Sequence, residues 1–243
     1  MEQVKKVKLA FSFSTKINNL NTKISERIDW YKLSMSRARK FGHQVIFYGC
    51  DTMINALDGY YDKGVDVSNE YFRLIDDLKI FIHENESIDI VTIDGDVILN
   101  KPLVIDKSVD IAFDKYEDLS YYNFYHKQFN FFKKNNKNIE NEIEHLTFNW
   151  DRACNVGVLC FNNKKVRDLF IDYYFKFHKY FFDNVLPEGD IAKARHSCVV
   201  CQYYMYCLVK SYGLKVSTTR NYSNNDYKHY IGDNKWRHNP SDL

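Results

Sequence analysis

Two carboxylates at close spacing follow an apolar run near the middle of the chain. Asp94 and Asp96 flank Gly95 in the stretch TIDGDVILN, and residues 88–93 before them are β-branched, short and without helical spacing. This pattern predicts a buried strand, and because side chains alternate along a strand, the two aspartates are expected on one face. Two like charges on one face repel each other unless a cation lies between them. Hard oxygen ligands suit Mg²⁺ or Mn²⁺, so Asp94 and Asp96 are candidate metal ligands, and Gly95 would let backbone approach a bound ligand.

Two later stretches carry polar residues of the kind that would complete such a site. The first, NVGVLCFN, begins at Asn155, and the second, HYIGDNKW, begins at His229. Histidine can be a third metal ligand. Gly232 would let main-chain N–H groups approach a phosphate, and Lys235 would supply a point charge for it. Taken alone, each of these residues is more simply explained as an ordinary surface residue.

The elements predicted around these residues alternate between strands and helices. Strands are predicted at 4–13, 44–48, 88–101, 109–113, 155–161 and 214–218, and helices at 25–41, 71–84, 166–182 and 198–212. Residues 116–150 are expected to form a surface segment, and the tail 227–243 to be irregular. The alternation indicates an α/β fold with a mostly parallel central sheet flanked by helices. Ligands of such sheets bind beyond the carboxyl ends of the strands, where Asp94 and Asp96 are expected.

Composition narrows the possible classes of protein. The chain has 243 residues, of which 45% are apolar. This length and composition suit a single domain, residues 1–243, with a buried hydrophobic core. A net charge of +2 gives no electrostatic case for nucleic acid as a partner. No apolar run reaches the ~18 residues of a membrane span, and the first residues lack the apolar region of a signal peptide. A cytoplasmic location is therefore expected, in the host cytoplasm if the protein is viral.

Cysteine spacing gives little support to a zinc site. Cys198 and Cys201 have the CxxC spacing, but the sequence has neither a second such pair nor a nearby pair of histidines. The six cysteines are expected to be reduced thiols, most of them in the core.

The order of these parts resembles the metal-dependent glycosyltransferases of the GT-A fold, and is most similar to the retaining group containing glycogenin and the bacterial lipopolysaccharide galactosyltransferases. In that group one strand ends in Asp-x-Asp, a later strand carries Asn-x-Gly and ends in Phe-Asn, and a C-terminal His-x-x-Gly-x-x-Lys-Pro-Trp closes the site. The matching positions here are Asp94, Asp96, Asn155, Gly157, Phe161, Asn162, His229, Gly232, Lys235 and Trp236. The proline of the closing motif is missing, because Trp236 follows Lys235 directly.

This resemblance implies both an activity and a division of the chain. It implies a nucleotide-binding half at about 1–115, and an acceptor side with the closing motif at about 116–243. It implies transfer of a sugar, with retention, from a nucleoside-diphosphate sugar, most often a UDP-sugar, to a glycan, glycoprotein or lipid. It also implies Mn²⁺, or Mg²⁺, held by Asp94, Asp96 and His229 and bridging the diphosphate of the donor.

Further donor-binding residues follow from the same resemblance. The loop after the first strand matches the place where the family holds base and ribose, and contains Phe11, Ser12, Phe13, Ser14 and Thr15. A helix before the metal-bearing strand offers the donor a basic residue in the family. Lys79 is the best match for it, and Arg73 is the alternative. With Asn155, Gly157, Gly232 and Lys235, these residues form the predicted donor site.

The sugar-side polar residues have no direct match. The family opens a helix with an Asp-Gln pair after its Phe-Asn strand, and this chain has no such pair at that place. Asp190, Gln202 and Asp151 are the candidates for contacting donor or acceptor during catalysis. None of the three is assigned as a nucleophile.

Two other functions fit parts of the pattern. An Asp-x-Asp after an apolar strand also opens the haloacid-dehalogenase phosphatases, where the first aspartate is the nucleophile and Mg²⁺ lies beside it. Those enzymes need a well-spaced second acid after a late Gly-Asp, which this sequence lacks. The other alternative is a protein that binds a nucleotide sugar without turning it over. Only catalysis would need Asp94, Asp96, His229 and Lys235 together, and their joint presence argues against a protein that merely binds.

Overall fold

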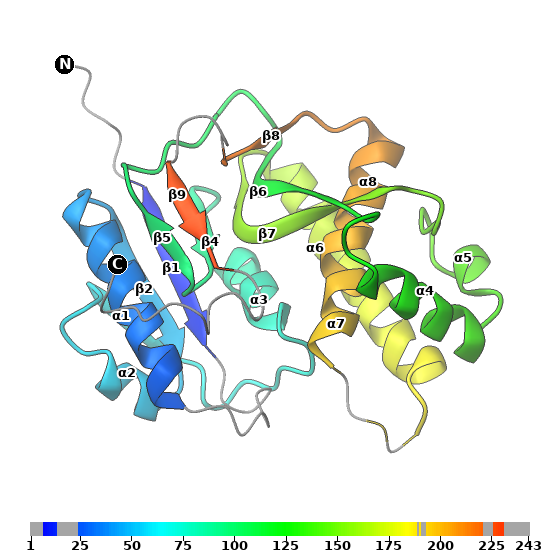
Figure 1. Cartoon of the computed structure of the whole chain (residues 1–243), viewed down its shortest axis with the longest axis horizontal. Coiled ribbons are helices and arrows are strands. Elements are labelled where there is room, and N and C mark those ends of the chain that lie inside the picture. The colour runs from blue at the N-terminus through cyan, green and yellow to red at the C-terminus, as the bar shows by residue number, and fades with distance from the viewer. Residues whose placement is uncertain (1–6, 14–23, 189, 191–192, 221–225, 231–243) are drawn as a thin grey trace.

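Strands from both halves of the chain join in one central sheet (Figure 1). In the computed structural model, which describes residues 7–13, 24–188, 190, 193–220 and 226–230, this sheet contains seven strands: β1 (Lys8–Phe13), β2 (Gln44–Gly49), β3 (Lys63–Asp66), β4 (Ile90–Ile93), β6 (Ile111–Asp118), β7 (Arg152–Phe161) and β8 (Val216–Thr218). Their order is β3-β2-β1-β4-β7-β6-β8, and β7 runs antiparallel to both of its neighbours. The other neighbouring pairs are parallel. The predicted α/β fold with a mostly parallel sheet is therefore confirmed.

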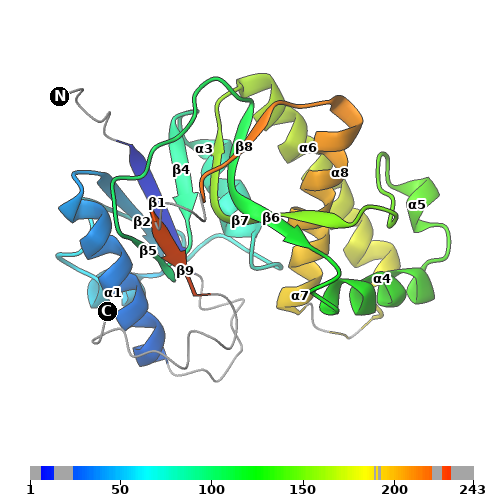
Figure 2. The same ribbon diagram turned by 45° about the horizontal axis from the view of Figure 1, so that its top comes forward.

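Helices cover both faces of this sheet (Figure 2). They include α1 (Ile24–Lys40), α2 (Asp51–Ala56), α3 (Asp77–Asn85), α6 (Lys164–Tyr180) and α8 (Tyr204–Tyr212). Side chains of β1 alternate between the two faces, so Leu9 and Phe11 share a buried cluster with α1 and α2, whereas Ala10 packs toward α3. A larger buried cluster joins β6 and β7 to α6 and α8. None of the described helices is both long and apolar enough to cross a bilayer.

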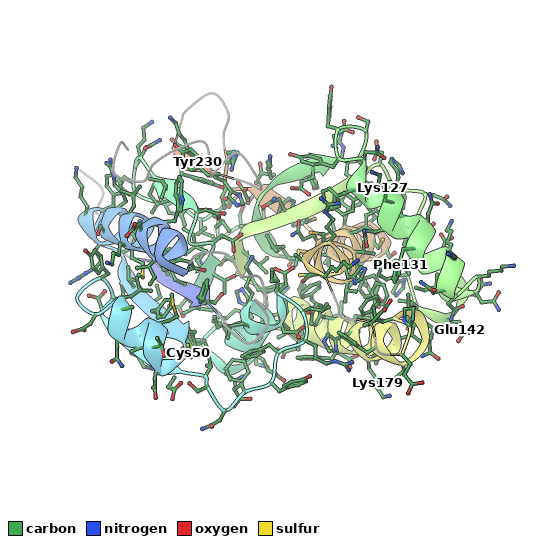
Figure 3. The ribbon with its side chains drawn as sticks, turned by 60° about the horizontal axis from the view of Figure 1, so that its bottom comes forward. Cys50, Lys127, Phe131, Glu142, Lys179 and Tyr230 are labelled. Atoms are coloured by element: carbon green, nitrogen blue, oxygen red, sulfur yellow. The ribbon has the colours of Figure 1, made fainter. Side chains whose placement is uncertain are left out.

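The segment predicted to lie on the surface at 116–150 instead contains two helices and packs part of its side chains into the core, which corrects that expectation. It contains α4 (Phe124–Asn135) and the short α5 (Ile139–Glu142). The aromatic residues Tyr125, Phe129 and Phe132 follow helical spacing and are all buried, so they pack into the core beside α6 and α8. The polar run KKNNKN, which suggested a solvated segment, lies at the end of α4 and in the turn after it. Figure 3 shows Phe131 and Glu142 on this helical side of the molecule, and Cys50 and Tyr230 on the side of α1 and α2.

The predicted C-terminal helix begins earlier than expected and changes its winding. It consists of α7 (Ala194–Ser197), a turn of π-helix η2 (Cys198–Tyr203), and then α8. Gly213, in the left-handed conformation with φ of 60°, ends α8 as predicted. A second π-helical turn, η1 (Phe181–Val185), extends α6.

The helix predicted at 71–84 begins only at Asp77, because the residues before it form turns. The Asp77 carboxylate accepts hydrogen bonds from the backbone N–H groups of Arg73 at 2.6 Å and Leu74 at 2.7 Å. These bonds fold residues 73–76 back against the start of α3. Tyr71, predicted in the first turn of the helix, is 81% exposed.

A small second sheet places residues 227–229 beside residues 97–99. It pairs β5 (Val97–Leu99) with β9 (Tyr227–His229) in antiparallel register, with Val97 opposite His229. The strand predicted at 88–101 is divided into β4 and β5, and residues 227–229, predicted to be irregular, form β9. Asp94 and Asp96 therefore lie in the turn that joins β4 to β5, and not on a strand as predicted.

Candidate metal centre

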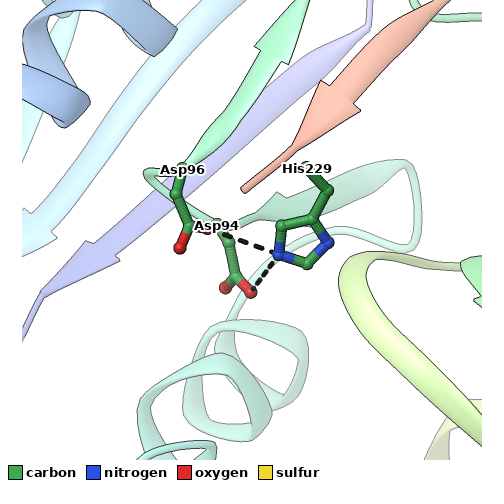
Figure 4. A group of neighbouring side chains, drawn as sticks. All are labelled: Asp94, Asp96 and His229. Carbon is green, nitrogen blue, oxygen red and sulfur yellow. Dashed lines mark ion pairs between the residues drawn. The ribbon is translucent and has the colours of Figure 1, made fainter. Parts of the chain in front are cut away.

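The turn after β4 and the end of β9 bring together the three residues predicted as metal ligands. The Nε2 atom of His229 lies 3.7 Å from Oδ2 of Asp94 and 3.3 Å from Oδ1 of Asp96 (Figure 4). Potential ligand atoms of all three residues lie within 4.8 Å of one another. Pairing of β5 with β9 produces this arrangement, because it places His229 beside Val97, the residue after Asp96.

The donor atoms suit a divalent cation. Mg²⁺ binds oxygen ligands in an octahedron at about 2.1 Å, so adjacent ligand atoms lie about 3 Å apart. The separations of 3.3 and 3.7 Å between the imidazole nitrogen and the carboxylate oxygens approach this value. Two carboxylates and one imidazole also suit Mn²⁺, whereas a structural zinc site is usually closed by four ligands rich in cysteine and histidine. The Asp94 side chain is 32% exposed, so the group is open to solvent.

Lys79, predicted to bind the donor, contacts one of these aspartates directly. Its Nζ atom lies 2.7 Å from Oδ1 of Asp94 and 3.4 Å from Oδ1 of Asp76, and donates to the Val156 carbonyl at 3.2 Å. An ammonium has three donors, so these partners occupy all of them. Burial would lower the pKa of Lys79, but the charges of Asp94 and Asp76 raise it, so the group stays cationic. Lys79 thus holds Oδ1 of Asp94, while Oδ2 faces His229.

Sequence analysis does not identify Asp114, which contacts the histidine from the other side. Its fully buried carboxylate accepts a hydrogen bond from Nδ1 of His229 at 2.7 Å. The predicted strand ends at residue 113, one residue before Asp114, whereas β6 continues to Asp118. The only signal in the sequence is an acidic residue directly after the apolar run 109–113, and its partner lies more than a hundred residues further along.

The charges at the centre shift the pKa values of its members. Burial lowers the pKa of His229, but hydrogen bonds with Asp114 and Asp96 outweigh this effect and raise it to about 9. Burial raises the pKa of Asp94 above its ordinary value, although Lys79 opposes the shift. Burial would also raise the pKa of Asp114, but the hydrogen bond from His229 and the charge of Arg220 hold it below its ordinary value. Without a metal, a protonated His229 would partly balance the carboxylates.

Two glycines make room for the rings around the turn. A Cβ atom at Gly157 would lie 2.2 Å from Cε1 of His229, and a Cβ at Gly95 would lie 2.4 Å from the ring of Tyr31. Gly157 lies where the register between β6 and β7 shifts, and its carbonyl accepts a hydrogen bond from the backbone N–H of Asp94 at 2.8 Å. Both predicted glycines are therefore needed for close packing at the centre.

A chain of hydrogen bonds leads from Asn155 away from the centre. The Asn155 amide accepts from the backbone N–H of Gly157 at 2.9 Å and donates to Glu117 at 2.7 Å. Glu117 also accepts from the hydroxyl of Tyr125 at 2.8 Å, and this hydroxyl lies 3.5 Å from the Gln202 side-chain oxygen. The structure thus connects two predicted residues, Asn155 and Gln202, through two that sequence analysis missed.

The other predicted site residues are more scattered. Phe11 and Phe13 are buried in the core, and the Ser12 carbonyl accepts a hydrogen bond from the Tyr31 hydroxyl at 2.6 Å. Arg73 stacks its guanidinium 3.3 Å from the centre of the Phe182 ring. Two of the predicted catalytic residues, Asp151 and Asp190, are exposed, and among the described contacts neither bonds to Asp94, Asp96 or His229. Four predicted residues lie outside the described ones: Ser14, Thr15, Gly232 and Lys235.

Comparison with known proteins finds similarity in structure but not in sequence. No family model matches the chain, and no curated protein matches it. Among solved structures, the chain is similar to the glycosyltransferase GlyE of Streptococcus pneumoniae TIGR4, with 15% identity and a TM-score of 0.44. This similarity covers 90% of the present chain but 46% of GlyE, so the chain spans less than half the length of that protein.

Two further solved structures are similar over most of both chains. The galactosyltransferase LgtC, in complex with donor and acceptor sugar analogs, has 11% identity and a TM-score of 0.48, over 93% of this chain and 87% of LgtC. Mouse xyloside xylosyltransferase 1 has 9% identity and a TM-score of 0.43, over 88% of this chain and 84% of the mouse protein. All three are named as glycosyl-transferring enzymes. At such identities and TM-scores the function of the present chain has to be inferred from its own site.

Proposed function

We propose that this protein is a metal-dependent glycosyltransferase, which moves a sugar from a nucleoside-diphosphate sugar to a glycan, glycoprotein or lipid acceptor. The donor is proposed to be a UDP-sugar. The observation that carries this proposal is the meeting of Asp94, Asp96 and His229, which come from two distant segments of the chain, at one group of potential ligand atoms within 4.8 Å. These residues would hold Mn²⁺ or Mg²⁺.

The proposed reaction explains why such a centre would be useful. Breaking the bond between the sugar and the diphosphate puts negative charge on the leaving phosphate. A bound divalent cation would stabilise that charge as it develops. Loss of one preorganised electrostatic contact of this kind costs about 2.7–4 kcal/mol of transition-state stabilisation.

Lys79 is proposed to act through Asp94. Since its three donors are occupied by Asp94, Asp76 and the Val156 carbonyl, the ammonium keeps one oxygen of Asp94 fixed and favours its ionised form. The other oxygen of Asp94 lies 3.7 Å from Nε2 of His229. Lys79 would then position a metal ligand without contacting the donor.

Calorimetric titration of UDP, with and without Mn²⁺, tests the proposed donor site. Wild type is expected to bind UDP tightly only with Mn²⁺, and Asp94→Asn/Asp96→Asn to bind it at least about 100-fold more weakly, or about 2.7 kcal/mol. Asp89→Asn is the matched control, because Asp89 precedes the same strand β4 at its other end and is exposed. UDP binding that needs neither metal nor the two carboxylates would contradict the proposal.

Product analysis separates transfer from the other functions. Incubation with a panel of UDP-sugars and glycan acceptors should release UDP and extend an acceptor. NMR of the new linkage should show the same anomer as the donor, because we propose retention. An inverted anomer would contradict retention only. Release of phosphate from an aryl phosphate, abolished by Asp94→Asn, would instead favour a phosphatase.

A further inference from the structure

We propose that Asp114 is a positioning residue of the metal centre, which fixes His229 so that its Nε2 atom is presented to the cation. This inference rests on the proposed metal-dependent function and adds a residue to it. Asp114 would not contact the cation itself. It would act through the imidazole, which lies between the Asp114 carboxylate and the two aspartates of the turn.

The two imidazole nitrogens face opposite partners. Nδ1 of His229 lies 2.7 Å from Oδ2 of Asp114, whereas Nε2 lies 3.3 Å from Asp96 and 3.7 Å from Asp94. When a carboxylate accepts the N–H of one ring nitrogen, the lone pair of the other nitrogen is available to a metal. The contact with Asp114 therefore selects both the orientation of the ring and the nitrogen that can bind.

Asp114 is itself held rigidly. Its Oδ1 accepts from the Tyr227 hydroxyl at 2.6 Å and from Nε of Arg220 at 3.0 Å, and its Oδ2 lies 3.2 Å from a terminal nitrogen of Arg220. With His229, these contacts give the carboxylate four hydrogen bonds, which is close to its full capacity. A carboxylate bound in this way cannot rotate to follow the imidazole, so it fixes the ring in one position.

The backbone of β7 leaves room for the ring of His229 in this arrangement. Gly157 belongs to β7, where the pairing with β6 shifts register beside Asp114. A Cβ atom at residue 157 would lie 2.6 Å from Nδ1 of His229, the atom that donates to Asp114. The absence of a side chain at Gly157 and the contact with Asp114 together define where the imidazole can lie.

An alternative role for Asp114 is purely structural: it also binds Arg220 and Tyr227, and so anchors the chain between β8 and β9. These two roles predict different results. An anchor alone would change the free energy of unfolding but not the environment of a cation bound by His229. A positioning residue would change the affinity for Mn²⁺ and the coupling between Mn²⁺ and the imidazole nitrogen.

The test compares Asp114→Asn with wild type by calorimetric titration with Mn²⁺ alone. Loss of a partner behind a metal-binding histidine typically weakens metal binding about 10- to 100-fold, and this range is expected here. Electron spin echo spectroscopy of the Mn²⁺-loaded proteins should show nitrogen coupling from one imidazole in wild type and weaker coupling in the variant. His229→Gln identifies that signal, because it should abolish it.

Asp110→Asn is the matched control. Asp110 precedes the same strand β6 and accepts hydrogen bonds from the Lys215 backbone and from Asn163, and it does not contact His229. Its Mn²⁺ affinity should equal that of wild type. If Asp114→Asn does not fold, Tyr227→Phe takes its place, because it removes one hydrogen bond from Asp114 and leaves the Asp114–His229 pair. That variant should bind Mn²⁺ about tenfold more weakly, the lower end of the same range.

The outcomes separate this inference from the proposed function. Wild type that binds no Mn²⁺ would overturn the metal centre and the role of Asp114 with it. Wild type that binds Mn²⁺, together with a folded Asp114→Asn of equal affinity and equal nitrogen coupling, would overturn the role of Asp114 alone. The same holds for Tyr227→Phe, should it be the variant measured.

Discussion

One added methyl group at Gly157 should displace the imidazole of His229 from the proposed metal centre. A Cβ atom at this position would lie 2.2 Å from Cε1 and 2.6 Å from Nδ1 of the ring. The closest ordinary contact is 3.4 Å, so the ring has to move by about 1.2 Å. The backbone at residue 157 is held in place, because its carbonyl accepts from the Asp94 N–H and its neighbours Val158 and Asn155 pair with β4 and β6.

The size of the effect follows from comparing this displacement with what a metal bond tolerates. Ligand distances in metal sites vary by only about ±0.2 Å, so a ring displaced by about 1.2 Å no longer binds. Disturbing the partner behind a ligand costs about 10- to 100-fold, and loss of the ligand itself should cost more. We therefore expect Gly157→Ala to bind Mn²⁺ at least about 100-fold more weakly, which is about 2.7 kcal/mol. Overpacking should also lower the free energy of unfolding by about 1–3 kcal/mol.

Calorimetric titration with Mn²⁺ measures the first effect, and urea unfolding the second. Gly64→Ala on β3 is the control for a glycine in the sheet, because its Cβ would lie 3.1 Å from the ring of Tyr61 and should not alter Mn²⁺ binding. In the double variant with His229→Ala the ring is gone, so the methyl group should cost much less stability. A folded Gly157→Ala that binds Mn²⁺ as tightly as wild type would refute the reasoning.

Three further substitutions test other contacts, and urea unfolding measures each. Gly95→Ala places a methyl group 2.4 Å from the Tyr31 ring and should lower the free energy of unfolding by about 1–3 kcal/mol; an unchanged value would contradict this packing. Lys79→Met leaves Asp94 without its ammonium partner and should cost about 3–5 kcal/mol, part of which added Mn²⁺ should restore. Burial would raise the pKa of Asp77, but hydrogen bonds from a histidine, a tyrosine and backbone hold it below its ordinary 3.8. The ionised carboxylate stabilises the fold at any pH above its pKa in the unfolded chain, and this stabilisation is lost as pH falls through the lower pKa of the folded chain. Wild type should therefore have a higher free energy of unfolding than Asp77→Asn at pH 7, and the difference should shrink below about pH 3.8. An advantage that does not depend on pH would contradict this account.

Local patterns predict the parts of the fold that short segments determine. The apolar runs before Asp94 and after Asn155 are strands, and Gly213 ends its helix as expected. Alternation of strands and helices was enough for the α/β class, because each element shows its own periodicity in sequence. Helix α4 was missed although Tyr125, Phe129 and Phe132 carry helical spacing, since the neighbouring polar run KKNNKN suggested a solvated segment.

Pairings between distant segments could not be predicted in the same way. Strands β5 and β9 have three residues each, too few to show a periodicity, and each is stabilised by the other. The motif resemblance nevertheless placed His229 with Asp94 and Asp96, because it depends on order along the chain and not on secondary structure. Asp114 belongs to no quoted motif, and its contact with His229 appears only in the folded chain.

The charges at the centre explain why UDP and metal should bind together. Among the described residues, four carboxylates lie in one connected group with two permanent cations: Asp76, Asp94, Asp96 and Asp114 with Lys79 and Arg220. This group carries a net charge of about −2 with a neutral His229 and about −1 with a protonated His229, so it repels a diphosphate in either form. A divalent cation brings the net charge close to zero and offers the phosphate oxygens a partner. Each ligand should therefore raise the affinity for the other by the same factor, as linkage requires. The fixed cations do not replace the metal, because Lys79 takes only Oδ1 of Asp94 and Arg220 contacts Asp114 behind the imidazole.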